Sequence, residues 1–143
     1  ASDYPAIVAL EGRRRLILSD YDYSRGQESA VEFERRAAAR AREIDAVRWV
    51  FAVPQVWQIA AGVVSARAVS HHPLRPGEQE TITWMAYDRD DGVDYGRVAY
   101  TRRPNGEPVF GEPEVFTIDV RPGELMPGFA LLRAILDDAE TSL

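Results

Sequence analysis

Residues 47–69 read VRWVFAVPQVWQIAAGVVSARAV and form the most continuous apolar stretch of the chain, with two of its three Trp. Every second residue from 47 to 53 is large and apolar, which is the period-two pattern of a β-strand. Pro54 has no N–H to donate to a ladder. The pattern therefore predicts a strand over 47–53, a break at Pro54, and a second strand over 56–69 that bends at Gly62.

A membrane span is the competing interpretation of the same stretch. Its length is sufficient, because a spanning helix needs about 20 mainly apolar residues. However, Arg48, Pro54, Gln55 and Gln58 interrupt the run. We therefore expect core strands of a soluble protein.

The segment before this stretch predicts a hairpin followed by a long helix. Residues 6–10 and 15–18 are short apolar pieces on either side of a Glu-Gly pair. Over 25–46, apolar residues recur at helical spacing, and Ser24 followed by Gln27 has the form of a capping box. The apolar stripe of this helix consists of Ala30, Phe33, Ala37, Ala41 and Ile44.

The segment after the central stretch predicts further strands and a short helix. Strands are expected over 81–87 and 97–102, joined by a polar turn, and over 108–120. A helix is expected over about 127–139, opening on a Pro at a favoured first-turn position. The sequence thus predicts one α+β domain over 1–143, with a mostly antiparallel sheet of five to seven strands packed by both helices. Small cone-shaped folds with a curved antiparallel sheet around a helix have a similar element order.

Composition excludes several kinds of chemistry. The chain of 143 residues has a net charge of −6, which disfavours binding to a nucleic-acid backbone. It contains no Cys, so thiolate nucleophiles and Cys-based metal sites are absent. All 17 basic residues are Arg, so no Lys can act as a base, form a Schiff base or hold a phosphate. We expect no cofactor and no resident metal.

The polar clusters of the sequence have weak signals for chemistry. His71 and His72 are the only histidines, and adjacent residues of an extended chain point to opposite sides. They are retained as binding candidates, although an exposed polar loop is the plainer interpretation. The acidic segment 88–94 lacks the ligand spacing of a calcium-binding EF-hand loop, so a solvated turn is expected there. Asp20 and Asp22 have the same interpretation.

The predicted hairpin 81–102 is the strongest candidate for a binding site, because neither of its faces is cleanly polar. Alternation is expected to place Ile82 and Trp84 on one face, and Met85, Tyr87, Val98 and Tyr100 on the other. Trp84 and Tyr100 offer large rigid side chains of the kind that anchors interfaces. Arg102 and Arg103 follow them and could hold a carboxylate. Cover by the helices, leaving both aromatics in the core, is the alternative.

These observations leave three kinds of function open, and a nucleic-acid binder ranks last of them because of the net charge. The first is a non-catalytic binding or protein-interaction module, with a protein partner or a second copy of the chain. The second is a small-molecule site in a cone-like cavity for an apolar or acidic ligand, including a cofactor-independent enzyme that uses carboxylates, Tyr and one His. The start of the chain, ASDYP, has no apolar signal segment, which favours a cytoplasmic location, although a secreted chain that had lost its signal would begin similarly.

Overall fold

The computed structural model describes residues 5–60, 63–68, 74–115 and 127–141. Within them, seven strands form one antiparallel sheet in the order β2-β1-β3-β5-β6-β7, with β4 paired to β3. The strands are β1 (Ala6–Glu11), β2 (Arg15–Asp20), β3 (Arg48–Ala60), β4 (Val63–Ala68), β5 (Glu78–Asp88), β6 (Gly92–Arg102) and β7 (Pro108–Val115). The helices are α1 (Gln27–Glu43) and α2 (Phe129–Thr141), with a short 3-10 turn η1 (Tyr23–Arg25) before α1. The predicted α+β class is confirmed.

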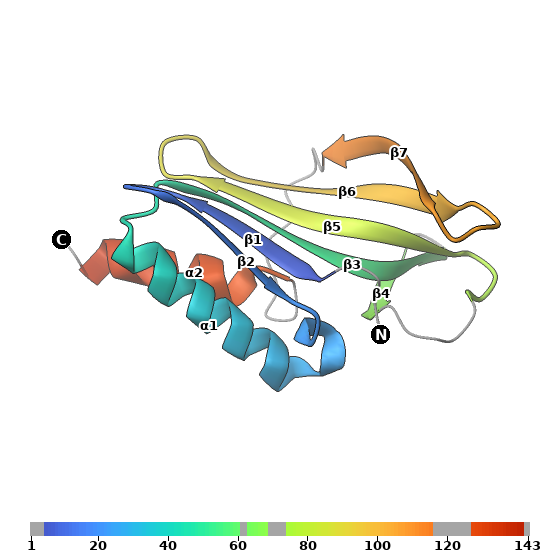
Figure 1. Cartoon of the computed structure of the whole chain (residues 1–143), viewed down its shortest axis with the longest axis horizontal. Helices are drawn as coiled ribbons and strands as arrows, with labels where there is room; N and C mark the ends of the chain where they lie inside the picture. The colour runs from blue at the N-terminus through green and yellow to red at the C-terminus, as the bar shows by residue number, and fades with distance from the viewer. Residues whose placement is uncertain (1–4, 61–62, 69–73, 116–126, 142–143) are drawn as a thin grey trace.

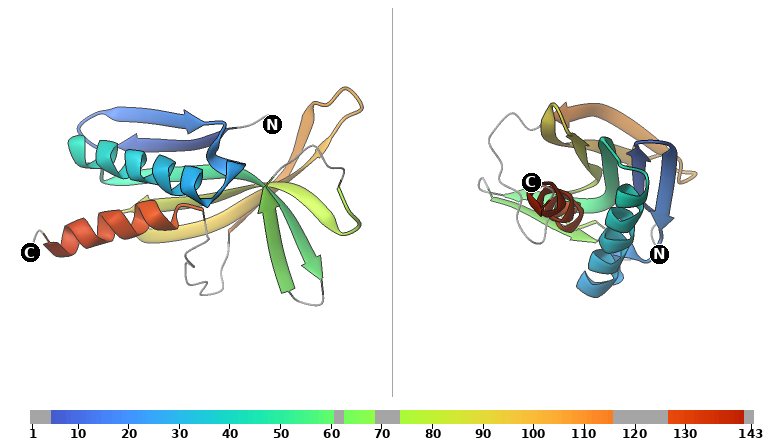
Figure 2. Two further views of the ribbon diagram at one scale, coloured as in Figure 1. Left: turned by 90° about the horizontal axis from the view of Figure 1, so that it is seen from below. Right: turned by 90° about the vertical axis from the view of Figure 1, so that its left-hand side faces the viewer.

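Figures 1 and 2 show a strongly twisted sheet with both helices on one of its faces. We call this the inner face and the opposite one the outer face. Neither of the two helices in the described part of the chain is long and apolar enough to span a membrane.

The central strand β3 differs from its prediction. It continues through Pro54 to Ala60 and turns back into β4, so the predicted second strand is in fact half of β3 and a separate antiparallel partner. β5 pairs with β3 from Arg48 to Gln58. On the other edge of β3, β1 pairs with residues 48–52 and β4 pairs with residues 55–60. Pro54 lies in that gap. A residue without an N–H is tolerated there because no neighbouring strand is present to receive the bond.

The hairpin of β5 and β6 is longer than the sequence predicted. The segment 92–96 was expected to be part of a turn, but it pairs with β5, with Gly92 opposite Asp88. Gly92 has a φ of 91°, which lets the chain reverse within residues 89–91. Val93 and Tyr95 therefore become strand residues that pack toward the core.

Side chains from the inner face and both helices form the hydrophobic core. The predicted stripe of α1 is confirmed, since Phe33, Ala37, Ala41 and Ile44 are buried. The predicted capping box is wrong, because α1 begins after Gly26 and has no side-chain cap. The inner face contributes buried residues from four strands: Val8, Leu10, Trp49, Phe51, Val53, Met85 and Tyr95.

A buried carboxylate joins the two helices. Glu34, on the buried side of α1, accepts a 2.6 Å hydrogen bond from the Tyr23 hydroxyl. Its other oxygen accepts a 3.1 Å hydrogen bond from the backbone N–H of Leu131, in the first turn of α2. The free N–H groups and the dipole of a helix N-terminus favour a negative charge. Glu34 thus caps α2 from a position 97 residues earlier in the chain.

Burial raises the pKa of this carboxylate and of the tyrosine beside it. Desolvation raises the pKa of Glu34 above its usual range, while the hydrogen bonds from Tyr23 and from α2 oppose that rise. Desolvation, together with the Glu34 charge, also raises the pKa of Tyr23 above its ordinary value. Gly128, immediately before α2, has a φ of 89° and lies against Met85, so the approach of α2 to this cap depends on a residue without a Cβ.

We expect Glu34→Ala to lower the free energy of unfolding by about 2–4 kcal/mol, because it leaves N–H groups of α2 unpaired in a buried place. Glu34→Gln should cost less than about 1 kcal/mol, since its amide oxygen can accept from Leu131 and its amide nitrogen can donate to the Tyr23 oxygen. Urea unfolding of both variants at pH 7 measures the difference. Equal losses for Ala and Gln would contradict a capping role.

The raised pKa of Glu34 also predicts a pH dependence of stability. The folded state holds this proton more tightly than the unfolded state, so the contribution is complete below about pH 4.3, the ordinary Glu pKa. It is lost as pH rises through the folded-state pKa. The free energy of unfolding of the wild type, minus that of Glu34→Gln, should therefore fall with rising pH. A flat or rising difference in urea titrations across this range would refute the assignment.

Candidate functional site

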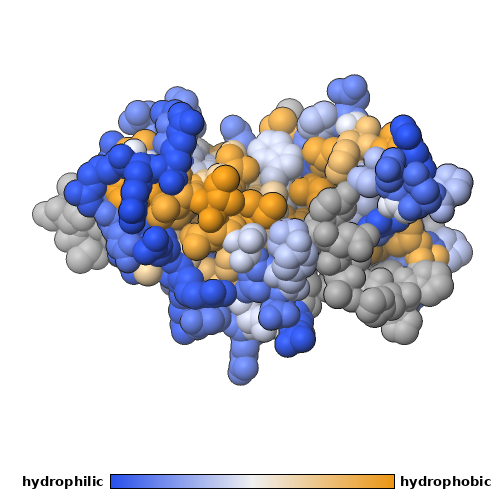
Figure 3. All heavy atoms as spheres, viewed as in Figure 1, coloured by the Kyte–Doolittle hydropathy of each residue, from blue (hydrophilic) through white to orange (hydrophobic). Residues whose placement is uncertain are grey.

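The outer face carries a patch of apolar side chains that neither helix of the described residues covers. Strand register places them in two adjacent rows across the sheet. One row consists of Ile17, Ala9, Val50 and Ala86, and the next of Ile7, Ala52 and Trp84. We call these seven residues the outer patch. Figure 3 shows apolar side chains gathered over β1, β2 and β3, bordered by hydrophilic ones.

The largest aliphatic residues of the outer patch are exposed to solvent. Ile17 is 76% exposed, Val50 46% and Ile7 39%. By contrast, Trp49 and Phe51, the chain neighbours of Val50, are buried in the core. Successive side chains of a strand point to opposite faces, so the two faces of β3 are both apolar, but only one is covered.

Trp84 forms the boundary of the outer patch toward the middle of the sheet. Its indole lies flat over Gly96, the opposite residue on β6, and a Cβ at position 96 would lie 2.1 Å from a ring carbon. An aromatic ring over a glycine on the neighbouring strand covers backbone that would otherwise be exposed to solvent. Trp84 is thereby fixed in place and half-buried, with part of its ring facing solvent.

A row of charged residues borders the outer patch at the end of the sheet where β1 turns into β2. Glu11 pairs with Arg15 at 3.9 Å and with Arg48 at 3.8 Å, and Arg48 also reaches Asp88 at 3.4 Å. Backbone N–H groups of the following turn lower the pKa of Asp88, with a smaller contribution from Arg48. These exposed pairs contribute little to stability. Their effect is to place both signs of charge beside an apolar surface.

One row of the outer patch, with Ile17, Ala9, Val50 and Ala86, and the charged border line a shallow, open hollow of about 600 Å³. Its floor consists of side chains from β1, β2, β3 and β5, and its edge of charged residues from both neighbouring turns. Contiguous apolar surface rimmed by polar residues is typical of interaction sites.

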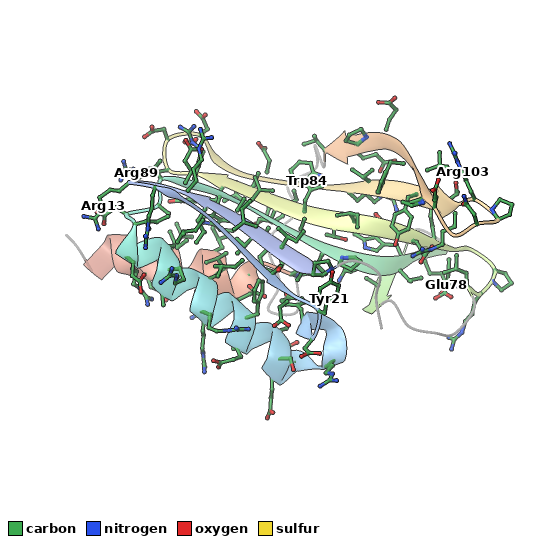
Figure 4. All side chains as sticks on the ribbon, viewed as in Figure 1. Arg13, Tyr21, Glu78, Trp84, Arg89 and Arg103 are labelled. Carbon is green, nitrogen blue, oxygen red and sulfur yellow. The ribbon has the colours of Figure 1, made fainter. Side chains whose placement is uncertain are left out.

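The predicted binding residues do not lie together. Trp84 stands at the middle of the outer face, whereas Arg103 lies at the far end of the sheet (Figure 4). Arg102 makes hydrogen bonds of 2.9 and 3.3 Å to the two carboxylate oxygens of Glu80, so its fork is occupied within the protein. Tyr100 is 3% exposed and packs against Phe110 with ring centroids 5.5 Å apart. His71 and His72 lie outside the described residues.

One expected face assignment is wrong. Val98 was expected beside Met85 and Tyr87, but it pairs with Ile82 and therefore shares the outer face with Trp84. Alternation places Tyr100 on that face as well. In the observed hairpin Asp88 lies opposite Gly92, so even-numbered residues of β6 lie opposite even-numbered residues of β5 and share their face.

Two polar clusters of the described residues have structural explanations. Tyr23 and Glu34 resemble an acid–base pair, but both are buried beneath the helices, and each carboxylate oxygen of Glu34 already accepts a hydrogen bond. On the far half of the inner face, the indole N–H of Trp57 lies 3.1 Å from both the Thr83 hydroxyl and the Gln55 side-chain oxygen. No group of three or more potential metal ligands is present among the residues that the structure describes.

The outer patch was not predicted from the sequence, although part of its signal is present there. Ile7, Ile17 and Val50 each occupy the position between two core residues of their strands, so the strands are apolar on both faces. Strands that are apolar on both faces occur where both faces of a sheet are covered, or where one face binds a partner. The neighbours across the strands, which make these residues contiguous, follow only from the sheet order.

Two valines of β3 test whether the outer patch is needed for folding. Val53→Ala should cost about 2–3 kcal/mol, because Val53 is 1% exposed and the deletion leaves a cavity. Val50→Ala should cost less than about 1 kcal/mol, because its side chain is already half in water. The same substitution in the same strand keeps backbone propensity equal in the two variants. Equal losses in urea unfolding would show that Val50 belongs to the core.

Comparison with known proteins found no match: no family model, no curated protein and no solved structure resembles this chain. The function is therefore inferred from the geometry of the site itself.

Proposed function

We propose that this protein is a non-catalytic interaction module that binds a protein partner through the outer face of its sheet. The observation that carries the proposal is the contiguous exposure of Ile7, Ile17 and Val50 on that face. Aliphatic surface of this kind costs about 25 cal/mol per Å² to leave in water. A partner that covers it would recover that free energy.

The architecture of the surface supports a protein as the partner. The surface extends over neighbouring strands and is open rather than enclosed. Its charged border, with Arg15, Glu11, Arg48 and Asp88, has the arrangement of a polar rim around an apolar centre. Trp84, held over Gly96, adds a rigid aromatic side chain of the type found at interface hot spots.

A small apolar ligand is the second candidate, because the hollow of about 600 Å³ is within the usual size range of ligand sites. Ligand sites normally bury most of the ligand surface. Here the largest aliphatic side chain, Ile17, is 76% exposed, so a small molecule on the outer patch would remain largely in water. The space between the inner face and the helices, where a cone-like fold would hold its ligand, is occupied by core side chains such as Phe33 and Leu131. A protein partner is therefore favoured.

Site-specific photo-crosslinking in the cells that produce the protein tests the proposal. A photoreactive phenylalanine derivative at position 17 lies in the outer patch, and the same residue at position 35 lies on the exposed side of α1. We expect a discrete protein adduct from position 17 and none from position 35. The adduct should disappear when Val50→Arg is added, since a charge would then lie in the centre of the contact.

The controls separate loss of binding from loss of folding. Val50→Arg must retain the circular dichroism spectrum of the wild type. Its urea midpoint must change by no more than a surface substitution usually causes. Adducts that form equally from positions 17 and 35, or from neither, would overturn the proposal. Transfer of the label to a small apolar molecule instead of a protein would favour the second candidate.

A further inference from the structure

We propose that this protein forms a symmetric dimer in which strand β2 of one copy pairs antiparallel with β2 of a second copy. The contact uses the open edge of the sheet, so it goes beyond the proposed function, which uses the outer face. Two observations carry it: the open backbone edge of β2 and the symmetry of the side chains along this strand.

The two ends of the strand order differ in how they are protected. The order ends in β2 on one side and in β7 on the other. Edge strands present unpaired N–H and C=O groups, and proteins protect them with Pro, charged residues and bulges. β7 has all of these, with Pro113 between Glu112 and Glu114 and an irregular register against β6. The middle of β2, which reads LILS over 16–19, has none of them.

The backbone of β2 directs every second residue away from β1. The Glu11 carbonyl accepts a 2.8 Å hydrogen bond from the Val47 N–H, so the backbone groups of Glu11 face β3. Successive residues of a strand face opposite sides, so those of Leu10 face β2 and exchange hydrogen bonds with the opposite residue, Leu16. By the same alternation, three residues of β2 direct their N–H and C=O groups to the open edge: Arg15, Ile17 and Ser19.

This edge is accessible. In the part of the chain that the structure describes, no strand lies beyond β2, and no hydrogen bond from another described residue reaches these backbone groups. The side chains of the same three residues are exposed. Figure 2 shows β2 as the outermost strand on its side of the sheet, with α1 packed against the inner face. A further strand can therefore add to β2.

A two-fold axis through Ile17, perpendicular to the sheet, satisfies the edge completely. Ile17 then lies opposite Ile17 of the second copy, and Arg15 of each copy lies opposite Ser19 of the other. Opposite residues of this type exchange both of their hydrogen bonds in an antiparallel pair. Every N–H and C=O group that β2 directs to the edge is thereby paired. A register shifted by two residues leaves some of them unpaired.

The side chains match in the same register. On the outer face, Ile17 lies beside its own copy, and on the inner face Leu16 lies opposite Leu18. Apolar pairs across neighbouring strands stabilise a sheet. A shift of two residues in one direction would place Leu16 opposite Asp20, and a shift in the other would place Arg15 opposite Ile17. A contact about a two-fold axis must be complementary to itself, and this register of β2 meets that condition.

Charges at the two ends of β2 agree with this register. Its continuation places Arg14, in the turn before β2, opposite Asp20 at the end of β2 in the second copy. Arg14 is exposed and forms no ion pair with another described residue. Asp20 binds Arg36 of its own chain at 3.1 Å, and a carboxylate has room for a second guanidinium. Opposite charges at both ends favour the antiparallel direction.

The dimer has two structural consequences. The axis is perpendicular to the sheet, so the outer patches of both copies lie on the same side and meet at Ile17. Because β7 is protected, pairing stops at two copies instead of continuing into a fibre. Stable interfaces bury about 800 Å² on each partner, and one short strand offers less. We therefore expect a dimer that dissociates in the micromolar range.

Two matched arginine substitutions test the position of the contact. Ile17→Arg places like charges directly opposite each other, so the dissociation constant should rise at least about tenfold. Val109→Arg makes the same change at an exposed residue of β7, the opposite edge, and should leave the dissociation constant unchanged. Sedimentation equilibrium from about 10 μM to about 1 mM measures both. A wild type that stays monomeric throughout, or equal weakening by the two variants, would overturn the inference.

Ser19→Pro tests the backbone pairing separately. It removes an N–H that faces the open edge, so the dissociation constant should again rise at least about tenfold while the urea midpoint changes no more than for a surface substitution. Ser19→Ala keeps the N–H and should dimerise like the wild type. Equal affinities of the two variants would contradict the pairing. A large fall in the urea midpoint of Ser19→Pro would show that this N–H binds β1, which contradicts the pairing as well.

The outcomes separate this inference from the proposed function. A monomeric wild type overturns the dimer, while an adduct with a different protein at position 17 would still support the interaction module. An adduct of twice the chain mass that Ser19→Pro abolishes supports the dimer. An adduct of that mass that Ser19→Pro retains counts against pairing through β2.

Discussion

The pairing of β3 on both edges is the constraint on which the rest of the structure depends. β5 follows it over eleven residues on one side, while β1 and then β4 occupy the other side. Because side chains alternate along a strand, Trp49, Phe51 and Val53 lie in the core. Val50, in the same strand, lies on the opposite surface. The core and the candidate site are therefore two faces of the same strand, and neither can shift its register without the other.

The second constraint is that two helices cover only one face of the sheet. They are held together by Glu34, which spans the distance from α1 to the N-terminus of α2. A buried carboxylate is expensive unless hydrogen bonds satisfy it, and here Tyr23 and the helix backbone do so. This arrangement uses both amphipathic helices on the inner face. In the part of the chain that the structure describes, no helix remains for the outer face, where apolar side chains of β1, β2 and β3 are exposed to solvent.

Charge then gives direction to an apolar surface that would otherwise bind without selectivity. Hydrophobic burial is non-directional, whereas ion pairs at the edge of an interface set its register and exclude wrong partners. The basic turn and the acidic turn lie on opposite flanks of the outer patch. The acidic turn serves the fold as well, since Asp88 accepts hydrogen bonds from the backbone of Asp90 and Asp91.

The sequence by itself determined the α+β class, the stripe of α1 and the exclusion of Cys and Lys chemistry, because periodicity and composition are local properties. It did not determine the continuity of β3 through Pro54, since tolerance of a missing N–H depends on which strands lie alongside. It did not give the face of Val98, because that depends on which residue of β5 lies opposite it. The cap on α2 and the outer patch were decided only by tertiary structure. Both join residues far apart in the chain, and no local pattern records such neighbours.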